Sequence, residues 1–262
     1  MGVPDPLLPD RRPDPAAAPP AVDLDLAPVP TSALAIGAHP DDIEFGCGAT
    51  LAKWAAAGCT VHHLVLTDGS KGTWDTEAHR PTLVARRRDE QRAAAAALGA
   101  TGEVVFLDQV DGELESSLAL RGEVARVIRR LRPEVLLGHD PWRRYRLHPD
   151  HRHAGWLTVD GVVAARDPHF FPEHGLPHHR PDCLLLWEAD EANHVEDVGG
   201  FVDAKLAALL AHESQFESTM GVAGDDDDSG LTAFRQRVLS KLGDHGALGG
   251  VALGEAFHRL GL

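Results

Sequence analysis

The stretch ALAIGAHPDDIEFGCG, residues 33–48, joins an apolar run to a group of side chains that can bind a metal. Residues 33–37 carry no charge, which is typical of a buried strand. A histidine, a proline and two adjacent carboxylates follow at His39, Pro40, Asp41 and Asp42. A segment of helical composition then begins near residue 50 and ends before Gly58. The stretch therefore predicts a strand, a polar turn and a helix in succession.

The same alternation of strand and helix continues along the chain. Further strands are predicted at residues 61–66, 104–107, 135–137 and 183–187, and helices at 83–98, 118–131, 151–165, 201–212 and near 233–242. Strands that alternate with helices favour a mostly parallel sheet with helices on both faces. The 262 residues and 43% hydrophobic content suffice for one large α/β domain, which we expect over residues 31–262.

Two segments differ from this pattern. Residues 1–30 hold nine of the eighteen prolines and no regular period, which predicts an extended arm. The arm is either disordered or packed on a neighbouring subunit, so a homo-oligomer is left open. Residues 225–228 are four successive aspartates. They lack the ordered ligand spacing of a calcium loop, and we interpret them as a solvated loop.

Charge and cysteine content narrow the function classes. The formal net charge of −15 opposes binding to nucleic acid and to anionic lipid. No apolar stretch approaches the ~20 residues of a membrane span, and no secretion signal is recognisable, so we expect a cytoplasmic protein without membrane partners. The three cysteines contain no CxxC pair and are interpreted as reduced thiols.

A second polar segment, DPWRRYRLHPDH at residues 140–151, follows the predicted strand at 135–137. In a parallel α/β sheet, ligands bind beyond the carboxyl ends of the strands. The segments 39–42 and 140–151 each follow such an end. We therefore expect their side chains to meet at one edge of the sheet.

Together the two segments supply the ligands of a catalytic zinc ion. Such a site needs three nitrogen or oxygen ligands and an open position for water, and His39, Asp42 and His151 provide the three. Asp41 then lies free beside the metal, where it can take the proton of the metal-bound water as general base. His148 is left to polarise a substrate carbonyl or protonate a leaving group, with Asp150 holding its ring.

Other interpretations compete with this one. HPDD alone is compatible with a simple turn, and HPDH alone with a helix N-cap. Two histidines and a carboxylate also suit the Fe(II) of an oxygenase. A non-catalytic sugar- or nucleotide-binding domain is a further alternative, although the first strand end lacks G-x-G-x-x-G. The occurrence of two His-Pro-Asp segments, each after an apolar strand, favours the metal site.

These residues also carry a resemblance to a known family. AHPDDIEFGCGATL, with HPDH downstream, resembles the LmbE-like, or PIG-L, N-deacetylases. TDGSKG at 67–72, the R-x-x-E pair Arg87 and Glu90, and HESQ at 212–215 resemble further family segments, so the similarity runs from about residue 33 to 220. One departure is Ile43, where many members have glutamate.

The resemblance implies a Rossmann-like three-layer sandwich and a divalent metal, usually zinc, held by His39, Asp42 and His151. It assigns Asp41 as general base, His148 to the oxyanion or the leaving amine, and Asp150 as the partner of His148. Arg87 is implied to bind substrate or brace the pocket, unless it merely pairs with Glu90 on the helix face. The implied reaction removes an N-acetyl group from an amino-sugar small molecule. An amidase that cuts a larger amide, like the mycothiol-conjugate amidases, is the alternative.

Overall fold

The computed structural model describes residues 22–223 and 228–262, and confirms the predicted α/β class. Its strands are β1 (Asp23–Leu24), β2 (Ser32–Gly37), β3 (Thr60–Thr67), β4 (Val104–Gln109), β5 (Val135–His139), β6 (Cys183–Trp187), β7 (His194–Asp197) and β8 (Gly254–Gly261). Its α-helices are α1 (Asp42–Ala56), α2 (Arg80–Ala97), α3 (Leu118–Leu131), α4 (Pro149–Arg166), α5 (Val202–Leu210) and α6 (Asp228–Gly249). Short helical turns lie at Pro172–His174, Glu213–Gln215 and Phe216–Met220.

The strands form one sheet in the order β1-β7-β8-β6-β5-β2-β3-β4. Strands β6, β5, β2, β3 and β4 run parallel, and so does the pair β1 and β7. Only β8 among the described strands is antiparallel to its neighbours, β6 and β7. The sheet is therefore mostly parallel, as the alternating sequence predicts.

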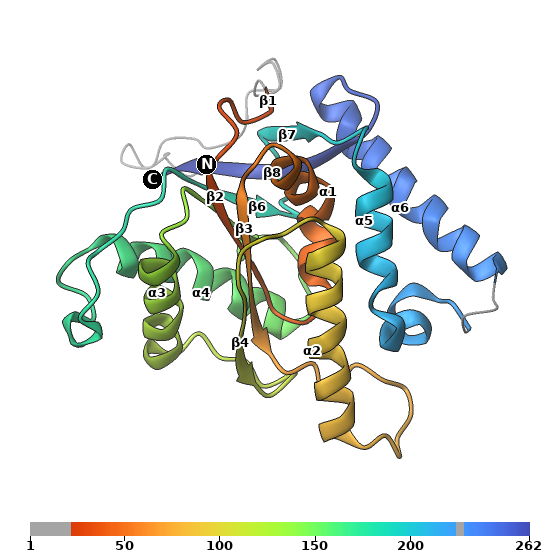
Figure 1. The fold of residues 1–262 in the computed structure, drawn as a ribbon, viewed down its shortest axis with the longest axis horizontal. Helices are drawn as coiled ribbons and strands as arrows, with labels where there is room; N and C mark the ends of the chain where they lie inside the picture. The colour runs from red at the N-terminus through yellow and green to blue at the C-terminus, as the bar shows by residue number, and fades with distance from the viewer. Residues whose placement is uncertain (1–21, 224–227) are drawn as a thin grey trace, which may run out of the picture.

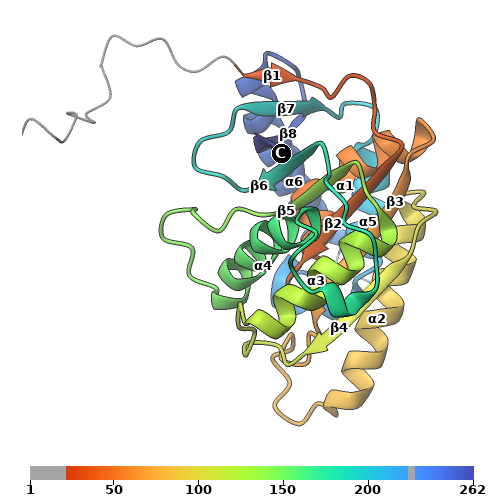
Figure 2. The ribbon, with the colours of Figure 1, turned by 90° about the vertical axis from the view of Figure 1, so that its left-hand side faces the viewer.

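Helices cover both faces of the sheet, as Figures 1 and 2 show. On β2, Ala33 and Ala35 pack with buried residues of α1, α2 and α5, whereas Leu34 and Ile36 pack with those of α3 and α4. The alternation arises because successive strand side chains point to opposite faces. Burial of each leucine or isoleucine contributes about 1.5–3 kcal/mol. A third apolar cluster joins α5 to α6.

The strand order places the two polar segments side by side. The chain passes from β2 to β3 and β4 on one side, then returns to β5 on the other side of β2. Ligands of open α/β sheets bind where the order reverses in this way. The loop after β2 carries residues 38–41, and the loop after β5 carries residues 140–148. Both open at the carboxyl edge of the sheet, between neighbouring strands.

Helix α1 begins earlier than predicted and is broken. It starts at Asp42 rather than near residue 50, and its backbone departs from helical geometry at Cys47 (φ −150°). The buried Lys205 ammonium donates to the carbonyls of Glu44 and Phe45 before the break, and the Glu255 carboxylate accepts from the amides of Ala49 and Thr50 after it. The two side chains pair at 2.7 Å. One ion pair thus satisfies backbone groups on both sides of the break.

The structure answers in part the predictions for the arm at residues 1–30 and the aspartates at 225–228. Residues 23–24 pair with β7, and Leu26 joins the main core, so residues 22–30 pack on this chain. Residues 1–21 and three of the four successive aspartates lie outside the described residues. The division of the chain at residue 30 stays a prediction. Strands β7 and β8 were not predicted.

In residues 22–223 and 228–262, no helix is both long and apolar enough to cross a membrane. The cytoplasmic location and a homo-oligomer stay predictions.

Candidate metal centre and active site

A cavity of about 510 Å³ opens where the two polar segments meet. Such a volume lies in the usual ~300–1,000 Å³ range of small-molecule sites. All of the sequence-predicted site residues except Asp150 line it. Its lining comprises His39, Asp41, Asp42, Phe45, Gly46, Lys71, Gly72, Arg87, Asp111, Gly112, His139, His148, His151, Trp187, Glu188, Gln215, Thr219 and Lys241.

The three predicted metal ligands lie together, with the Asp42 carboxylate close to both imidazoles. His39 Nδ1 lies 3.3 Å from Asp42 Oδ2, and His151 Nε2 lies 3.1 Å from Asp42 Oδ1. The ligand atoms of the three residues all lie within 4.8 Å of one another. Two imidazoles and one carboxylate are a donor set that suits a divalent ion such as zinc. The arrangement therefore fits a metal at this point.

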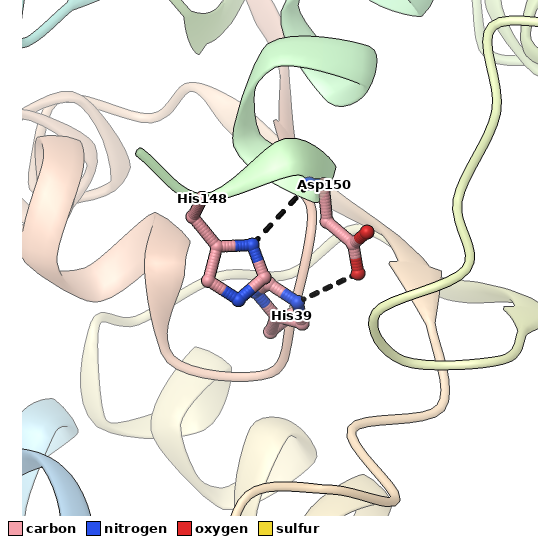
Figure 3. Close-up of side chains that lie close together, drawn as sticks. All are labelled: His39, His148 and Asp150. Atoms are coloured by element: carbon pink, nitrogen blue, oxygen red, sulfur yellow. Dashed lines mark hydrogen bonds and ion pairs between the residues drawn. The ribbon is translucent and has the colours of Figure 1, made fainter. Parts of the chain in front are cut away.

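A second possible ligand set, His39, His148 and Asp150, overlaps the first. The Asp150 carboxylate, however, already accepts hydrogen bonds from the amides of Gly112 (2.7 Å) and Leu114 (3.3 Å). It also lies 3.1 Å from His39 Nε2 (Figure 3). A metal-binding histidine commonly donates its other ring N–H to a carboxylate. The geometry thus favours the set with Asp42, in which Asp150 orients His39.

The electrostatic environment of this point favours positive charge. Burial opposes a charge on His39, but the Asp111, Asp150 and Asp42 carboxylates raise its pKa well above the ordinary value. Burial likewise acts to raise the pKa of Asp42, but its contacts with the His151 and His139 rings hold it well below its usual range. A cation is therefore stabilised beside an ionised carboxylate, which is the condition that a divalent metal requires.

His139, which the sequence analysis did not single out, supports Asp42 from β5. The Trp187 indole N–H donates to His139 Nδ1 at 3.0 Å, and His139 Nε2 lies 3.3 Å from Asp42 Oδ2. Burial lowers the pKa of His139 to about 4, so its ring is neutral and carries its proton on Nε2. His139 is thus placed to donate to the carboxylate rather than to bind the metal.

Asp41 occupies an unusual backbone conformation at the N-cap of α1. Its φ of 101° lies in the left-handed region, which costs a residue other than glycine about 1–3 kcal/mol. Its carboxylate lies 3.4 Å from Arg87 Nη2 and makes no capping bond to the helix. Burial raises the pKa of Asp41 to about 6, against the opposing charge of Arg87. Such strain is typical of functional positions.

His148 is held by the backbone of Asp150, which corrects the expected pairing. The Asp150 amide N–H donates to His148 Nδ1 at 3.2 Å, while the Asp150 carboxylate faces His39 (Figure 3). Successive residues of a helical first turn point in different directions, so the Asp150 side chain turns away from His148. Burial, with the charges of His39 and His151, lowers the pKa of His148. The neutral ring therefore carries its proton on Nε2.

Arg87 is buried and braces the loops of the site. Its guanidinium donates to the carbonyls of Gly69 (2.9 Å) and Pro40 (2.7 Å). A Cβ at Gly72 would lie 2.0 Å from Arg87 Nη1, so glycine is needed there for the close approach. The alternative in which Arg87 pairs with Glu90 is wrong, because Glu90 bonds to Arg86 and Ser214 instead.

Several residues of the site escaped sequence reasoning. Asp111 Oδ1 lies 3.2 Å from His39 Nε2, and Gln91 accepts the backbone N–H of Asp41. Glu188 and Lys241, which pair at 3.3 Å, complete another wall of the cavity. His139 directly precedes the segment 140–151, and its place at a strand end was an available signal. Gln91 sits mid-helix, and no local pattern marks it.

Comparisons with known proteins agree with this geometry. Residues 34–162 match the family model described as PIG-L, GlcNAc-PI de-N-acetylase. A diacetylchitobiose deacetylase of Thermococcus kodakarensis is 39% identical over 70% of this chain and 69% of its own length. A 1D-myo-inositol 2-acetamido-2-deoxy-alpha-D-glucopyranoside deacetylase of Rhodococcus opacus is 30% identical over 70% and 80%. The structure of N,N'-diacetylchitobiose deacetylase from Pyrococcus horikoshii, complexed with an inhibitor, superposes with a TM-score of 0.80 at 29% identity, covering 88% of this chain and 84% of that one.

Proposed function

The chain belongs to the PIG-L, or LmbE-like, family, and from this premise we propose that it is a zinc-dependent N-deacetylase. Its substrate class is an N-acetylated amino-sugar small molecule, and its products are acetate and a free amine. One observation carries the proposal: a buried carboxylate, Asp41, lies next to a complete three-ligand set at a cavity of substrate size.

His39, Asp42 and His151 hold the metal in this proposal. When bound, a divalent ion such as zinc lowers the pKa of coordinated water and polarises a carbonyl oxygen. Asp150 and Asp111 orient His39 through its Nε2, at 3.1 and 3.2 Å, and His139 donates to Asp42. Such outer hydrogen bonds fix the ring and carboxylate orientation that a metal requires.

Asp41 acts as the general base. A carboxylate with a pKa of about 6 is ionised near neutral pH, yet it is a stronger base than an exposed aspartate. It accepts the proton of the attacking water as the new bond to the acetyl carbon forms. Arg87, 3.4 Å away, steadies the ionised form. The proton then becomes available to the departing nitrogen, so that the amine leaves in neutral form.

The neutral His148 ring acts as a hydrogen-bond donor to the substrate. Because its Nδ1 accepts the Asp150 amide N–H, its Nε2–H remains free to bond the carbonyl oxygen as negative charge develops. Arg87 is assigned the bracing role, since the carbonyls of Pro40 and Gly69 occupy both of its terminal nitrogens.

The function is tested with the purified, zinc-loaded protein. N-acetylglucosamine, N,N'-diacetylchitobiose and N-acetylglucosaminyl-inositol are each incubated with it, and released acetate and free amine are measured. We expect equal amounts of the two products from at least one substrate, and a loss of turnover after treatment with a chelator. Substrates with a bulkier acyl group separate a deacetylase from an amidase of larger amides. Zinc-loaded protein that releases neither acetate nor amine from any of them would refute the proposal.

A further inference from the structure

One face of α2 holds both polar groups of a single peptide unit. The Pro40 carbonyl accepts from Arg87 Nη2 at 2.7 Å, and the Asp41 amide N–H donates to Gln91 Oε1 at 3.0 Å. These two groups belong to the same peptide bond. Arg87 and Gln91 are four residues apart on the helix, so their side chains lie on one face. Both are buried, with 2% and 0% exposure.

A buried chain of hydrogen bonds fixes the orientation of the Gln91 amide. Gln91 Nε2 donates to Glu44 Oε1 at 2.7 Å, and Glu44 Oε2 lies 3.3 Å from His212 Nε2. Glu44, Gln91 and His212 are fully buried. A carboxylate only accepts and an amide N–H only donates, so the Gln91 oxygen must face Asp41 and its nitrogen must face Glu44. Glu44 therefore fixes the Gln91 oxygen as the acceptor for the Asp41 N–H.

We propose that Gln91 is a positioning residue, which aims Asp41 at the cavity. Asp41 is left-handed at φ 101°, and rotation of the Pro40–Asp41 peptide plane would release this strain. Such a rotation carries the Pro40 carbonyl and the Asp41 N–H away from their partners together, and so breaks the bonds to Arg87 and Gln91. These two bonds, from Arg87 to the Pro40 carbonyl and from the Asp41 N–H to Gln91, are called the clamp below. The clamp keeps the Asp41 carboxylate where it can reach a proton of the attacking water. The inference rests on the proposed role of Asp41 as general base.

The first test replaces Gln91 by leucine, of similar volume, or by glutamate. Gln91→Leu cannot accept the Asp41 N–H, and Gln91→Glu sets a second carboxylate against that of Glu44. We expect kcat to fall about 100-fold in each, as for a catalytic group displaced by about 1 Å, with KM and zinc content unchanged. Thr50→Val is the matched control, because this fully buried side chain on α1 has no hydrogen-bond partner for its hydroxyl.

A swapped pair tells positioning from bulk packing. In Gln91→Glu/Glu44→Gln, the carboxylate introduced at position 91 accepts from the Asp41 N–H and from the amide introduced at position 44. The oxygen of that new amide accepts from His212, so the same chain of bonds is restored. We expect the swap to recover most of the kcat that Gln91→Glu loses. Suppose that kcat, zinc content and melting temperature fall and KM rises in Gln91→Glu, and that the swap restores none of them. Gln91 then serves only packing.

Hydrogen exchange gives a readout that does not depend on turnover. The Asp41 amide should be protected in the zinc-loaded wild type and exchange faster in Gln91→Leu, as followed by NMR. Unchanged protection, or wild-type kcat in Gln91→Leu, would overturn the clamp. A wild type that turns over no substrate while Gln91→Leu still loses this protection would instead refute the proposed function and leave the clamp standing.

Discussion

Asp41 must satisfy two chemical demands at one position. Its carboxylate has to be buried enough for a pKa of about 6, and its backbone has to adopt φ 101°. Aspartate and asparagine tolerate the left-handed region better than residues with longer or branched side chains. A substitution that tests the carboxylate must therefore spare the backbone, and asparagine does so.

We predict that Asp41→Asn lowers kcat by about 10²-fold or more and leaves zinc bound, because it removes the proton acceptor alone. Steady-state kinetics and elemental analysis of the same preparation check this. Wild-type turnover in the variant would remove Asp41 from the mechanism.

The two overlapping ligand sets make opposite predictions for two histidines. If Asp42 is a ligand, His151→Ala should lose most of the bound zinc, whereas His148→Ala should keep it and lose turnover. Zinc content after dialysis against metal-free buffer, with the wild type alongside, distinguishes them. Full occupancy in His151→Ala together with loss in His148→Ala would place the metal with His148 and Asp150.

At the scale of single residues, the sequence predicts the site residues of the segments 39–42 and 148–151. It misses the residues from other elements that pack against those segments. His39, Asp42 and His151 follow from strand ends that adjoin in a parallel sheet. Asp150 does hold the His148 ring, but through its backbone N–H, while its carboxylate faces His39, because side chains of neighbouring residues in a helical turn diverge. Gln91 was missed for another reason: its partners Asp41, Glu44 and His63 lie far from it in the sequence, and only packing brings them together.

At the scale of elements, the broken helix α1 depends on a buried ion pair. We predict that Lys205→Met lowers the free energy of unfolding by about 3–5 kcal/mol, because it leaves the Glu255 carboxylate buried without its cation. Urea denaturation of the metal-free protein measures the change. Lys241→Met is the control, because Lys241 is exposed and Glu188 keeps its pairs with Arg143 and Arg146 when Lys241 is removed, so the loss should be about 1 kcal/mol or less. Equal losses in the two variants would contradict the role of Lys205.

Glu188 joins the loop after β5 to α6 at the cavity wall. It lies 3.0 Å from Arg146, 3.1 Å from Arg143 and 3.3 Å from Lys241 of α6. Burial acts to raise the pKa of Glu188, but the charges of Lys241 and Arg146 outweigh it and lower the pKa to about 2. The folded state therefore favours the ionised carboxylate.

This shift predicts a pH-dependent contribution to stability. Because the folded pKa is depressed, the contribution is fully present above the ordinary value of 4.5 and is lost as the pH falls toward 2. Glu188→Gln should therefore be less stable than the wild type at pH 7, with the difference shrinking below pH 4.5. Urea denaturation at a series of pH values measures it, and a difference that stays constant with pH would contradict it.

The sequence predicts the long elements well and the short or unusual ones poorly. Helix α3 matches its predicted range, since its apolar residues repeat with helical spacing. The start of α1 has two glycines, which favour a turn locally, and becomes helical through the contacts of Lys205 and Glu255. Strand β7 has four residues, too few to show a period. Strand β8 forms by pairing with β6 and β7, which are distant from it in sequence.

At the scale of the whole molecule, the predicted catalytic residues and metal ligands lie within the matched residues 34–162, but the sheet extends well beyond them. Strand β8 separates β6 from β7 and supplies Glu255 to α1. We predict that a chain ending at residue 250 does not fold cooperatively, although it keeps every proposed ligand. Circular dichroism during heating, with zinc present, checks this. A sharp transition with zinc bound would show that β8 is dispensable.

The position of β8 has a consequence for synthesis on the ribosome. Strand β7 contacts the rest of the sheet through β8, and 56 residues separate the end of β7 from the start of β8. At 5–20 residues per second, about 3–11 s pass between the two. During this interval β6 exposes an unpaired edge, and unpaired edges invite pairing with other chains. We therefore expect the nascent chain to be most prone to association with other chains before β8 emerges.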